Sequence, residues 1–201
     1  STVFCLEKLS GQLIAIGGNG GLFFQEKNFL RRISAIKGEI LRILRVNHNT
    51  LWLSLRGGRV AQLQFPQGWE SEPIITEYGL EDGLPGSEVQ LALLGERVLF
   101  VTKEGIFRFN PDQKPAFQPY EALMAPGHEG HEELLALVVD LERKVWLVFP
   151  THVDIARLQP DGSYRFETPL VLHYPSWGWP VQIFVDREGI VWIGNRYQMI
   201  I

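Results

Sequence analysis

The chain has little of what several classes of protein require. Cys5 is its one cysteine among 201 residues, so no disulfide forms within the chain and cysteine content does not reveal the compartment. No apolar run reaches the roughly 18 residues of a membrane-spanning helix. The net charge is −4, and no basic cluster of the kind that binds nucleic acid is present. We therefore expect no nucleic-acid partner and no membrane contact from this segment itself.

Signatures of catalysis and of cofactor binding are also missing. The sequence contains no G-x-S-x-G nucleophile elbow. The glycine-rich stretch 17–21 lacks the Lys-Ser/Thr of a phosphate-binding loop. His128 and His131, with the nearby glutamates, suggest a metal site, but H-x-x-H is not the H-E-x-x-H spacing, and Pro126 opposes the helix that spacing needs. A solvated acidic loop is the favoured interpretation, and we expect no enzyme activity, no cofactor and no metal.

A short pattern recurs along the chain. Residues 186–195 read D-R-E-G-I-V-W-I-G-N, which is typical of a strand end, a tight turn at Gly189 and a second strand. Asp140 precedes Trp146 as Asp186 precedes Trp192, and such repetition favours a structural role for both aspartates. Related strands carry an aromatic or small residue at one anchor position, at Ala15, Trp52, Phe100, Trp146 and Trp192. The anchors are 37, 48, 46 and 46 residues apart, a spacing typical of propellers and related arrays.

Each copy predicts the same series of strands. The first strands are predicted at 3–6, 40–44, 89–93, 135–139 and 181–185. The third strands are predicted at 21–24, 59–63, 105–110, 153–158 and 197–201. A weaker fourth strand follows in four copies, for example at 74–78 and 165–168. One such unit cannot cover both its faces, so stacked units bury them against each other.

The sequence therefore predicts an all-β fold, a β-propeller of about four to five four-stranded blades. The chain forms one such segment, with blades at approximately 1–36, 38–78, 88–121, 134–170 and 180–201. Because both ends fall within strand patterns, we interpret the chain as a segment of a larger propeller. Five blades leave open edges unless something fills the last one, so we expect self-association or contact with missing propeller blades.

Two stretches resemble a known family. Residues 79–111, with G-L-E-D-G-L-P-G-S-E-V and V-L-F-V-T-K-E-G-I-F-R-F-N-P, resemble the two-component regulator propeller repeat, and so does V-Q-I-F-V-D-R-E-G-I-V-W-I-G-N at 181–195. The resemblance implies the periplasmic or extracytoplasmic sensor region of a hybrid two-component histidine kinase. It also implies a ligand that is often a carbohydrate, here a possible oligosaccharide.

Topology suggests where a ligand binds. In an up-and-down blade, the loop between strands two and three emerges on the same face as the link to the next blade. That face carries Arg56 and Lys103 and the candidate ligand-binding residues His152, Tyr174, Trp177, Trp179, Arg196 and Tyr197. Aromatic rings stack on sugar faces, and charged groups bind hydroxyls or acids. Alternatively the two tryptophans fill a blade junction, which is the favoured interpretation for Trp179, next to Pro180.

Two other functions stay open. The segment is alternatively a scaffold for protein–protein interaction or dimerisation without a small-molecule ligand. A propeller lyase is the third interpretation, and it requires a metal at His128, His131 or His152.

Overall fold

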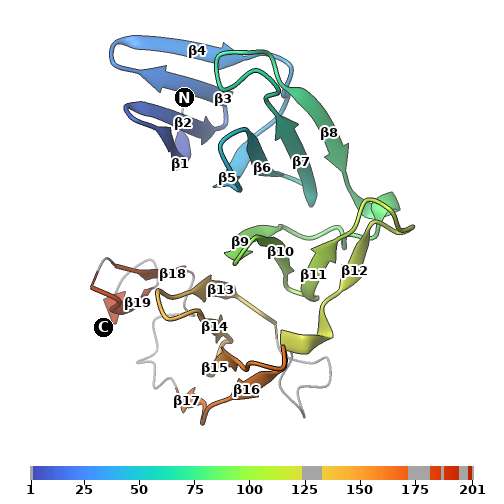
Figure 1. Cartoon of the computed structure of the whole chain (residues 1–201), viewed down its shortest axis with the longest axis vertical. Helices are drawn as coiled ribbons and strands as arrows, with labels where there is room; N and C mark the ends of the chain where they lie inside the picture. Colours follow the sequence, from blue (N-terminus) through green and yellow to red (C-terminus); the bar gives the residue numbers. More distant parts are fainter. Residues whose placement is uncertain (1, 124–132, 172–181, 187, 195–198, 201) are drawn as a thin grey trace.

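Five antiparallel sheets follow one another in chain order around an arc. The computed structural model describes residues 2–123, 133–171, 182–186, 188–194 and 199–200. Figure 1 shows the N-terminal sheet at one end of the arc and the C-terminal sheet at the other. This arrangement of sheets confirms the predicted all-β propeller fold.

The first three sheets have four strands each. The first holds β1 (Val3–Ser10), β2 (Leu13–Gly18), β3 (Gly21–Glu26) and β4 (Phe29–Ile33). The second holds β5 (Ile40–Arg45), β6 (Thr50–Leu55), β7 (Arg59–Gln64) and β8 (Ile74–Tyr78). The third holds β9 (Gln90–Leu94), β10 (Arg97–Thr102), β11 (Gly105–Phe109) and β12 (Phe117–Pro119). Short 3₁₀ turns occur at Leu80–Asp82 and Glu121–Leu123.

The last two sheets differ from this plan. The fourth contains β13 (Ala136–Val139), β14 (Lys144–Val148), β15 (His152–Leu158) and β16 (Tyr164–Phe166), and β17 (Leu170–Val171) also pairs with β15. The fifth contains β18 (Gln182–Val185), β19 (Val191–Gly194) and β20 (Met199–Ile200). In the part of the chain that the structure describes, the fifth sheet has three strands, as expected.

The first strand of each sheet lies on the inner side of the arc. β1 packs beside β5, β5 beside β9, β9 beside β13, and β13 beside β18. The last strands, β4, β8, β12 and β16, lie on the outer side (Figure 1). The predicted strand runs fall on observed strands where the chain is described. Their ends differ by at most two residues, except that β1 extends four residues beyond its predicted end. Apolar alternation therefore located the strands correctly.

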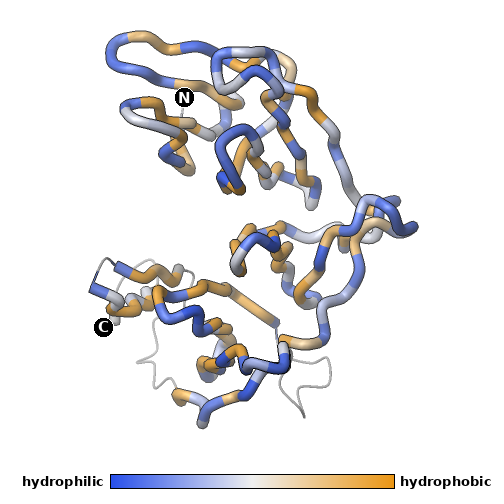
Figure 2. Tube along the Cα trace, in the orientation of Figure 1, coloured by the Kyte–Doolittle hydropathy of each residue, from blue (hydrophilic) through white to orange (hydrophobic). Residues whose placement is uncertain are grey.

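Four apolar clusters hold the arc together, one between each pair of consecutive sheets. Apolar positions recur along the inner and middle strands in Figure 2. Leu22, Phe24, Leu51 and Leu53 belong to the cluster between the first two sheets. The other clusters join the second and third, third and fourth, and fourth and fifth sheets. Each middle sheet is covered on both faces, which explains its continuous apolar runs.

The anchor alignment needs one correction. The rings of Trp52 and Phe100 meet edge to face, with centroids 4.9 Å apart, across the junction of the second and third sheets. Trp52 therefore faces forward along the arc and Phe100 faces backward, so the two positions are not equivalent. Leu99 faces forward into the next cluster and occupies the place that the pattern assigned to Phe100.

The loop residue Trp69 is buried, although it lies in a loop between two strands. It is 9% exposed. It packs edge to face on Phe65, at 5.0 Å between centroids, and on Phe24 of the first sheet. The guanidinium of Arg31 donates to the carbonyls of Trp69 and Glu70 and fixes the loop to β4.

Cys5 is half-buried in β1, consistent with the role of a small packing residue. A Cβ added to Gly17 would lie 2.7 Å from its Sγ, so the glycine leaves room for the thiol. Burial raises the pKa of Cys5 to about 11. The thiol therefore stays protonated at neutral pH and behaves as a small apolar group.

No described helix is both long and apolar enough to cross a membrane.

Candidate functional site

One hollow of the molecule lies where the first three sheets meet the segment before the fourth sheet. Its volume is about 720 Å³. Its charged and polar lining comprises Arg42, Arg56, Ser87, Glu88, Gln90, Thr102, Lys103 and Glu133. Val3 and Phe4 of the first sheet and Leu134 and Leu135 before the fourth add apolar surface. The lining therefore offers hydrogen-bond donors, acceptors and apolar patches in one open space.

Two of the predicted loops and one link meet at this hollow. Arg56 begins the turn between β6 and β7, Lys103 that between β10 and β11, and Glu88 lies in the link from β8 to β9. All three line the same hollow. In the second and third sheets the strand-two-to-three loops and the link between these sheets emerge together, so Arg56 and Lys103 lie on one surface.

Glycines let these loops approach closely. Gly58 has φ +72°, and a Cβ there would lie 2.6 Å from the carbonyl carbon of Gly86. The neighbouring Gly57 has φ +87° with no atom within 4 Å of an added Cβ. The β6–β7 turn thus packs directly on the link to the third sheet at Gly58.

Ion pairs hold the charged rim in place. Arg56 Nε donates to the carboxylate of Glu39, and its Nη1 lies 3.5 Å from Glu88 Oε1. The hydrogen bond to Glu39 raises the pKa of Arg56 above its ordinary value, so this group remains cationic. Ser87 Oγ donates to the carboxylate of Glu104, which joins the link to the next turn.

Two polar bonds, one buried and one half-buried, fix the backbone beside the hollow. Ser54 Oγ donates to the carbonyl of Val89 at 2.5 Å and joins the second sheet to the third. Gln90 Nε2 donates to the carbonyl of Leu135 at 2.5 Å and joins the third sheet to the segment before the fourth. These contacts therefore hold the second, third and fourth sheets in position around the hollow.

His152 lies at the start of β15 and does not line this hollow. Its ring stacks on Phe149, with centroids 4.8 Å apart and planes inclined by 14°. Nδ1 is 3.0 Å from Thr151 Oγ1, and Nε2 is 3.5 Å from Oδ1 of the buried Asp154. The backbone of His152 pairs with Val171, the residue that directly precedes 172–181. These contacts fix the histidine ring at the end of the fourth sheet.

The other candidate ligand-binding residues lie outside the described residues. They are Tyr174, Trp177, Trp179, Arg196 and Tyr197. Their role in ligand binding stays a prediction.

Sequence reasoning missed part of the lining. Arg42 of β5 and Gln90 of β9 both contribute to the hollow, and neither was expected there. Inner strands begin on the face where the links end, so the starts of first strands belong to this surface as much as the loops do. The up-and-down topology could therefore have predicted that polar residues of the inner strands contribute to this surface.

The structure offers no metal centre within its described residues. In these ranges, no group of three or more His, Cys, Asp or Glu side chains is placed to hold a metal ion. His128 and His131 lie outside the described residues, and Glu133 lines the hollow.

The repeated aspartates are structural, as their repetition predicted. Asp140 Oδ2 accepts from Trp146 Nε1 at 2.9 Å, and its Oδ1 accepts from the amides of Glu142 and Lys144. Asp186 does the same for Trp192, whose Nε1 is 2.7 Å from Oδ2. Each carboxylate closes the hairpin between the first two strands of its sheet.

Comparison with known proteins places the chain by fold. No protein-family model matches it, and no curated protein matches it. Among solved structures, it is similar to a protein named as the extracellular domain of a one-component system from B. thetaiotaomicron, with TM-score 0.67 and 17% identity over 99% of this chain and 26% of that one. The extracellular domain of a hybrid two-component system from the same organism gives TM-score 0.66 and 13% identity over 96% of this chain and 25% of that one.

An enzyme shares the fold as well. Virginiamycin B lyase from Staphylococcus aureus, solved with quinupristin, gives TM-score 0.62 and 16% identity over 95% of this chain and 62% of that one. At these identities the likeness establishes the propeller fold. The chain spans about a quarter of the length of the two extracellular domains.

Proposed function

We propose that this chain is a ligand-sensing segment of a periplasmic or otherwise extracytoplasmic β-propeller in a bacterial two-component signalling protein, and that its ligand is a carbohydrate. The observation that carries the proposal is the polar hollow of about 720 Å³ at the junction of the loops. Its size falls in the range of small-ligand sites. The names of the similar extracellular domains support a sensory role, with a histidine kinase elsewhere in the parent protein.

The chemistry of the lining favours a sugar. Arg56 and Lys103 donate hydrogen bonds, Glu88 and Glu133 accept them, and Gln90 does both. Sugar hydroxyls also donate and accept, so a mixed lining matches them better than a lining of one charge. Three cations in the lining, with Arg42 as the third, also suit an acidic sugar.

Binding would act on the junctions between sheets. The hollow is lined from the first to the fourth sheet, so a bound sugar would bridge elements that meet only through their junctions. A ligand shifts a conformational equilibrium by as much as its affinity differs between the two arrangements. We propose that bridging favours one arrangement of the sheets and that this change is passed to the rest of the protein.

We propose that the segment itself is non-catalytic. The lyase shows that the same fold also supports enzymes, so fold alone does not decide. Recovery of each sugar unchanged after prolonged incubation with the protein supports sensing, and a cleaved product contradicts it.

A thermal-shift screen tests the proposal. The purified chain is heated with a panel of neutral and acidic oligosaccharides, alongside Lys103→Ala and Trp177→Ala variants. We expect at least one sugar to raise the melting temperature of the wild type, because a ligand that binds the folded state stabilises it. Loss of the shift in Lys103→Ala assigns the hollow, and loss in Trp177→Ala extends the site to the predicted aromatic residues. The absence of any shift across the panel contradicts the proposal.

A further inference from the structure

A second hollow, here called the tyrosine hollow, lies between the third and fourth sheets. Its volume is about 620 Å³, and its lining includes Leu94, Glu96, Arg97, Tyr120, Leu158 and Tyr164. The third sheet packs between the second and the fourth, and the fourth between the third and the fifth, so both walls of this junction belong to the chain. Arg97 begins β10, whereas Thr102, at the other end of the same strand, lines the hollow described above. The two hollows share no lining residue and are separate places in the fold.

An arginine and two tyrosines meet in the tyrosine hollow. Arg97 Nη1 donates to the hydroxyl of Tyr120 at 2.8 Å, and its guanidinium carbon lies 5.2 Å from the centre of the Tyr120 ring. The hydroxyl of Tyr164 shares a hydrogen bond with that of Tyr120. Burial first, and then the neighbouring Tyr120, raise the pKa of Tyr164 above its ordinary value, whereas the charge of Arg97 lowers it. Tyr164 therefore remains a neutral phenol at neutral pH.

These three side chains have hydrogen-bond donors left over. In the part of the chain that the structure describes, no carboxylate forms an ion pair with Arg97. A guanidinium carries several N–H groups, and the bond to Tyr120 uses one of them. Two phenols that share a hydrogen bond use one O–H in it, whichever way it runs, and leave the other O–H free to donate. The tyrosine hollow therefore offers a guanidinium and a phenol O–H to a ligand.

The rest of the lining suits an apolar body with an acid at one end. Leu94 is half-buried and Leu158 is 42% exposed, and both border the hollow. The rings of Tyr120 and Tyr164 pack against the apolar cluster between the two sheets. Glu96, in the β9–β10 turn, is exposed and is the one acidic residue of the lining. Donors thus gather at Arg97, and apolar surface lies beside them.

We propose that the tyrosine hollow binds a small carboxylic acid with an apolar ring, its carboxylate on Arg97 and a tyrosine hydroxyl and its ring against Leu94 and Leu158. A guanidinium and a carboxylate form two parallel charge-assisted hydrogen bonds, which are stronger than bonds between neutral groups. The volume of the hollow falls in the range of small-ligand sites. The inference is independent of the proposed sugar ligand, because the sugar is assigned to the other hollow.

An NMR titration of the isotope-labelled chain with benzoate tests the proposal. Benzamide is the matched control ligand, because it has nearly the same shape without the charge. We expect benzoate to bind with a dissociation constant of about 1 mM and to shift the amide signals of residues 94–97 and 158–164. Benzamide should bind at least about 10-fold more weakly. The absence of a saturable shift up to about 20 mM benzoate, or equal binding of benzamide, overturns the proposal.

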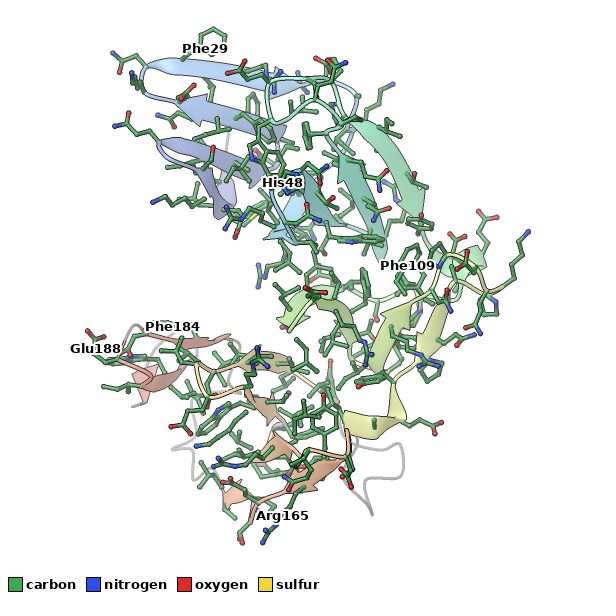
Figure 3. The ribbon with its side chains drawn as sticks, viewed as in Figure 1. Phe29, His48, Phe109, Arg165, Phe184 and Glu188 are labelled. Atoms are coloured by element: carbon green, nitrogen blue, oxygen red, sulfur yellow. The ribbon has the colours of Figure 1, made fainter. Side chains whose placement is uncertain are left out.

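Charge-changing variants locate the bound acid. Arg97→Gln removes the guanidinium and should weaken benzoate binding about 10-fold or more. Glu96→Gln removes the acidic group of the lining and should strengthen binding by about 2-fold. Arg165→Gln is the matched control, since Arg165 (Figure 3) is exposed and follows Tyr164 in β16, where successive side chains point to opposite faces. This control should bind benzoate as the wild type does. Dispersed amide signals show that each variant is folded.

The contrary results are equally specific. Unchanged affinity in Arg97→Gln, or an equal loss in Arg165→Gln, overturns the proposal, and so does weaker binding in Glu96→Gln. Lys103→Ala distinguishes the two hollows, because it should lose sugar affinity and keep its affinity for benzoate. Loss of benzoate binding in Lys103→Ala would place the acid in the other hollow and overturn the inference.

Discussion

Two aspartates place a tryptophan in each of the last two sheets. Asp140 and Asp186 each accept an indole N–H with one oxygen and backbone amides with the other. One side chain therefore closes the turn and orients the ring on the forward face of its sheet. This explains why the sequence repeats both residues together, six positions apart.

Replacing Asp140 should destabilise the fold, although its side chain is small. Asp140→Ala leaves the indole of Trp146 and two turn amides without their acceptor, and we expect it to lower the free energy of unfolding by about 1–3 kcal/mol. Denaturant unfolding measures this change. Glu142→Ala is the matched control in the same turn, because the exposed Glu142 contributes a surface ion pair to Lys144 and should cost about 0.5 kcal/mol or less. Equal effects of both substitutions would show that the carboxylate bonds contribute little.

The contribution of Asp186 should depend on pH. The hydrogen bond from Trp192 lowers the pKa of Asp186 below its ordinary 3.8, with help from backbone amides of the turn. A depressed carboxyl pKa stabilises the fold above the unfolded pKa, and this contribution is lost as pH falls through the folded pKa. The stability difference between wild type and Asp186→Ala should therefore be constant above about pH 5 and shrink below pH 3.8.

Unfolding at a series of pH values measures that difference. A gap that keeps its size into strong acid would contradict a charged acceptor at this turn.

At the scale of strands and loops, close packing of the turns shapes the hollow. Gly58→Ala adds a Cβ in a left-handed conformation and against the backbone of Gly86, so we expect a loss of about 3 kcal/mol or more. Gly57→Ala adds the same group at a similar φ in open space and should cost about 1 kcal/mol. Thermal unfolding compares the two variants. Similar losses would mean that the turn does not need its contact with the link.

Most of the strand positions and part of the loop arrangement could be predicted from the sequence. Period-two apolar patterns and glycine turns located the strands, because each strand buries one or both faces in the same way in every sheet. The predicted common face of Arg56 and Lys103 followed from up-and-down topology alone. Both inferences depend on local pattern and connectivity, which the sequence carries directly.

Other features depend on contacts between distant segments. The third sheet joins Leu94 to Arg97 with a two-residue turn, which is shorter than the Asp140 turn of the fourth sheet. The residue equivalent to Trp52 therefore lies one position earlier than Phe100, at Leu99. Trp69 is buried because Arg31, in another sheet, fixes its loop, and no local signal shows that. Arg42 reaches the hollow only because inner strands begin beside the links.

At the scale of the molecule, stability is a sum over junctions. Each sheet packs mainly on its neighbours, so every junction contributes on its own and the end sheets have one junction each. The same plan brings loops of several sheets to one hollow.

The central claim is that the hollow binds a sugar, and isothermal titration calorimetry tests it most directly. The oligosaccharide that gives the largest thermal shift is titrated into the wild type, Lys103→Ala and Arg165→Ala, the last being a control on the outer strand β16 (Figure 3). Loss of one charged hydrogen bond should weaken binding to Lys103→Ala by roughly 10- to 100-fold and leave Arg165→Ala unchanged. Equal affinity for wild type and Lys103→Ala, or no measurable heat with any sugar, would contradict the claim.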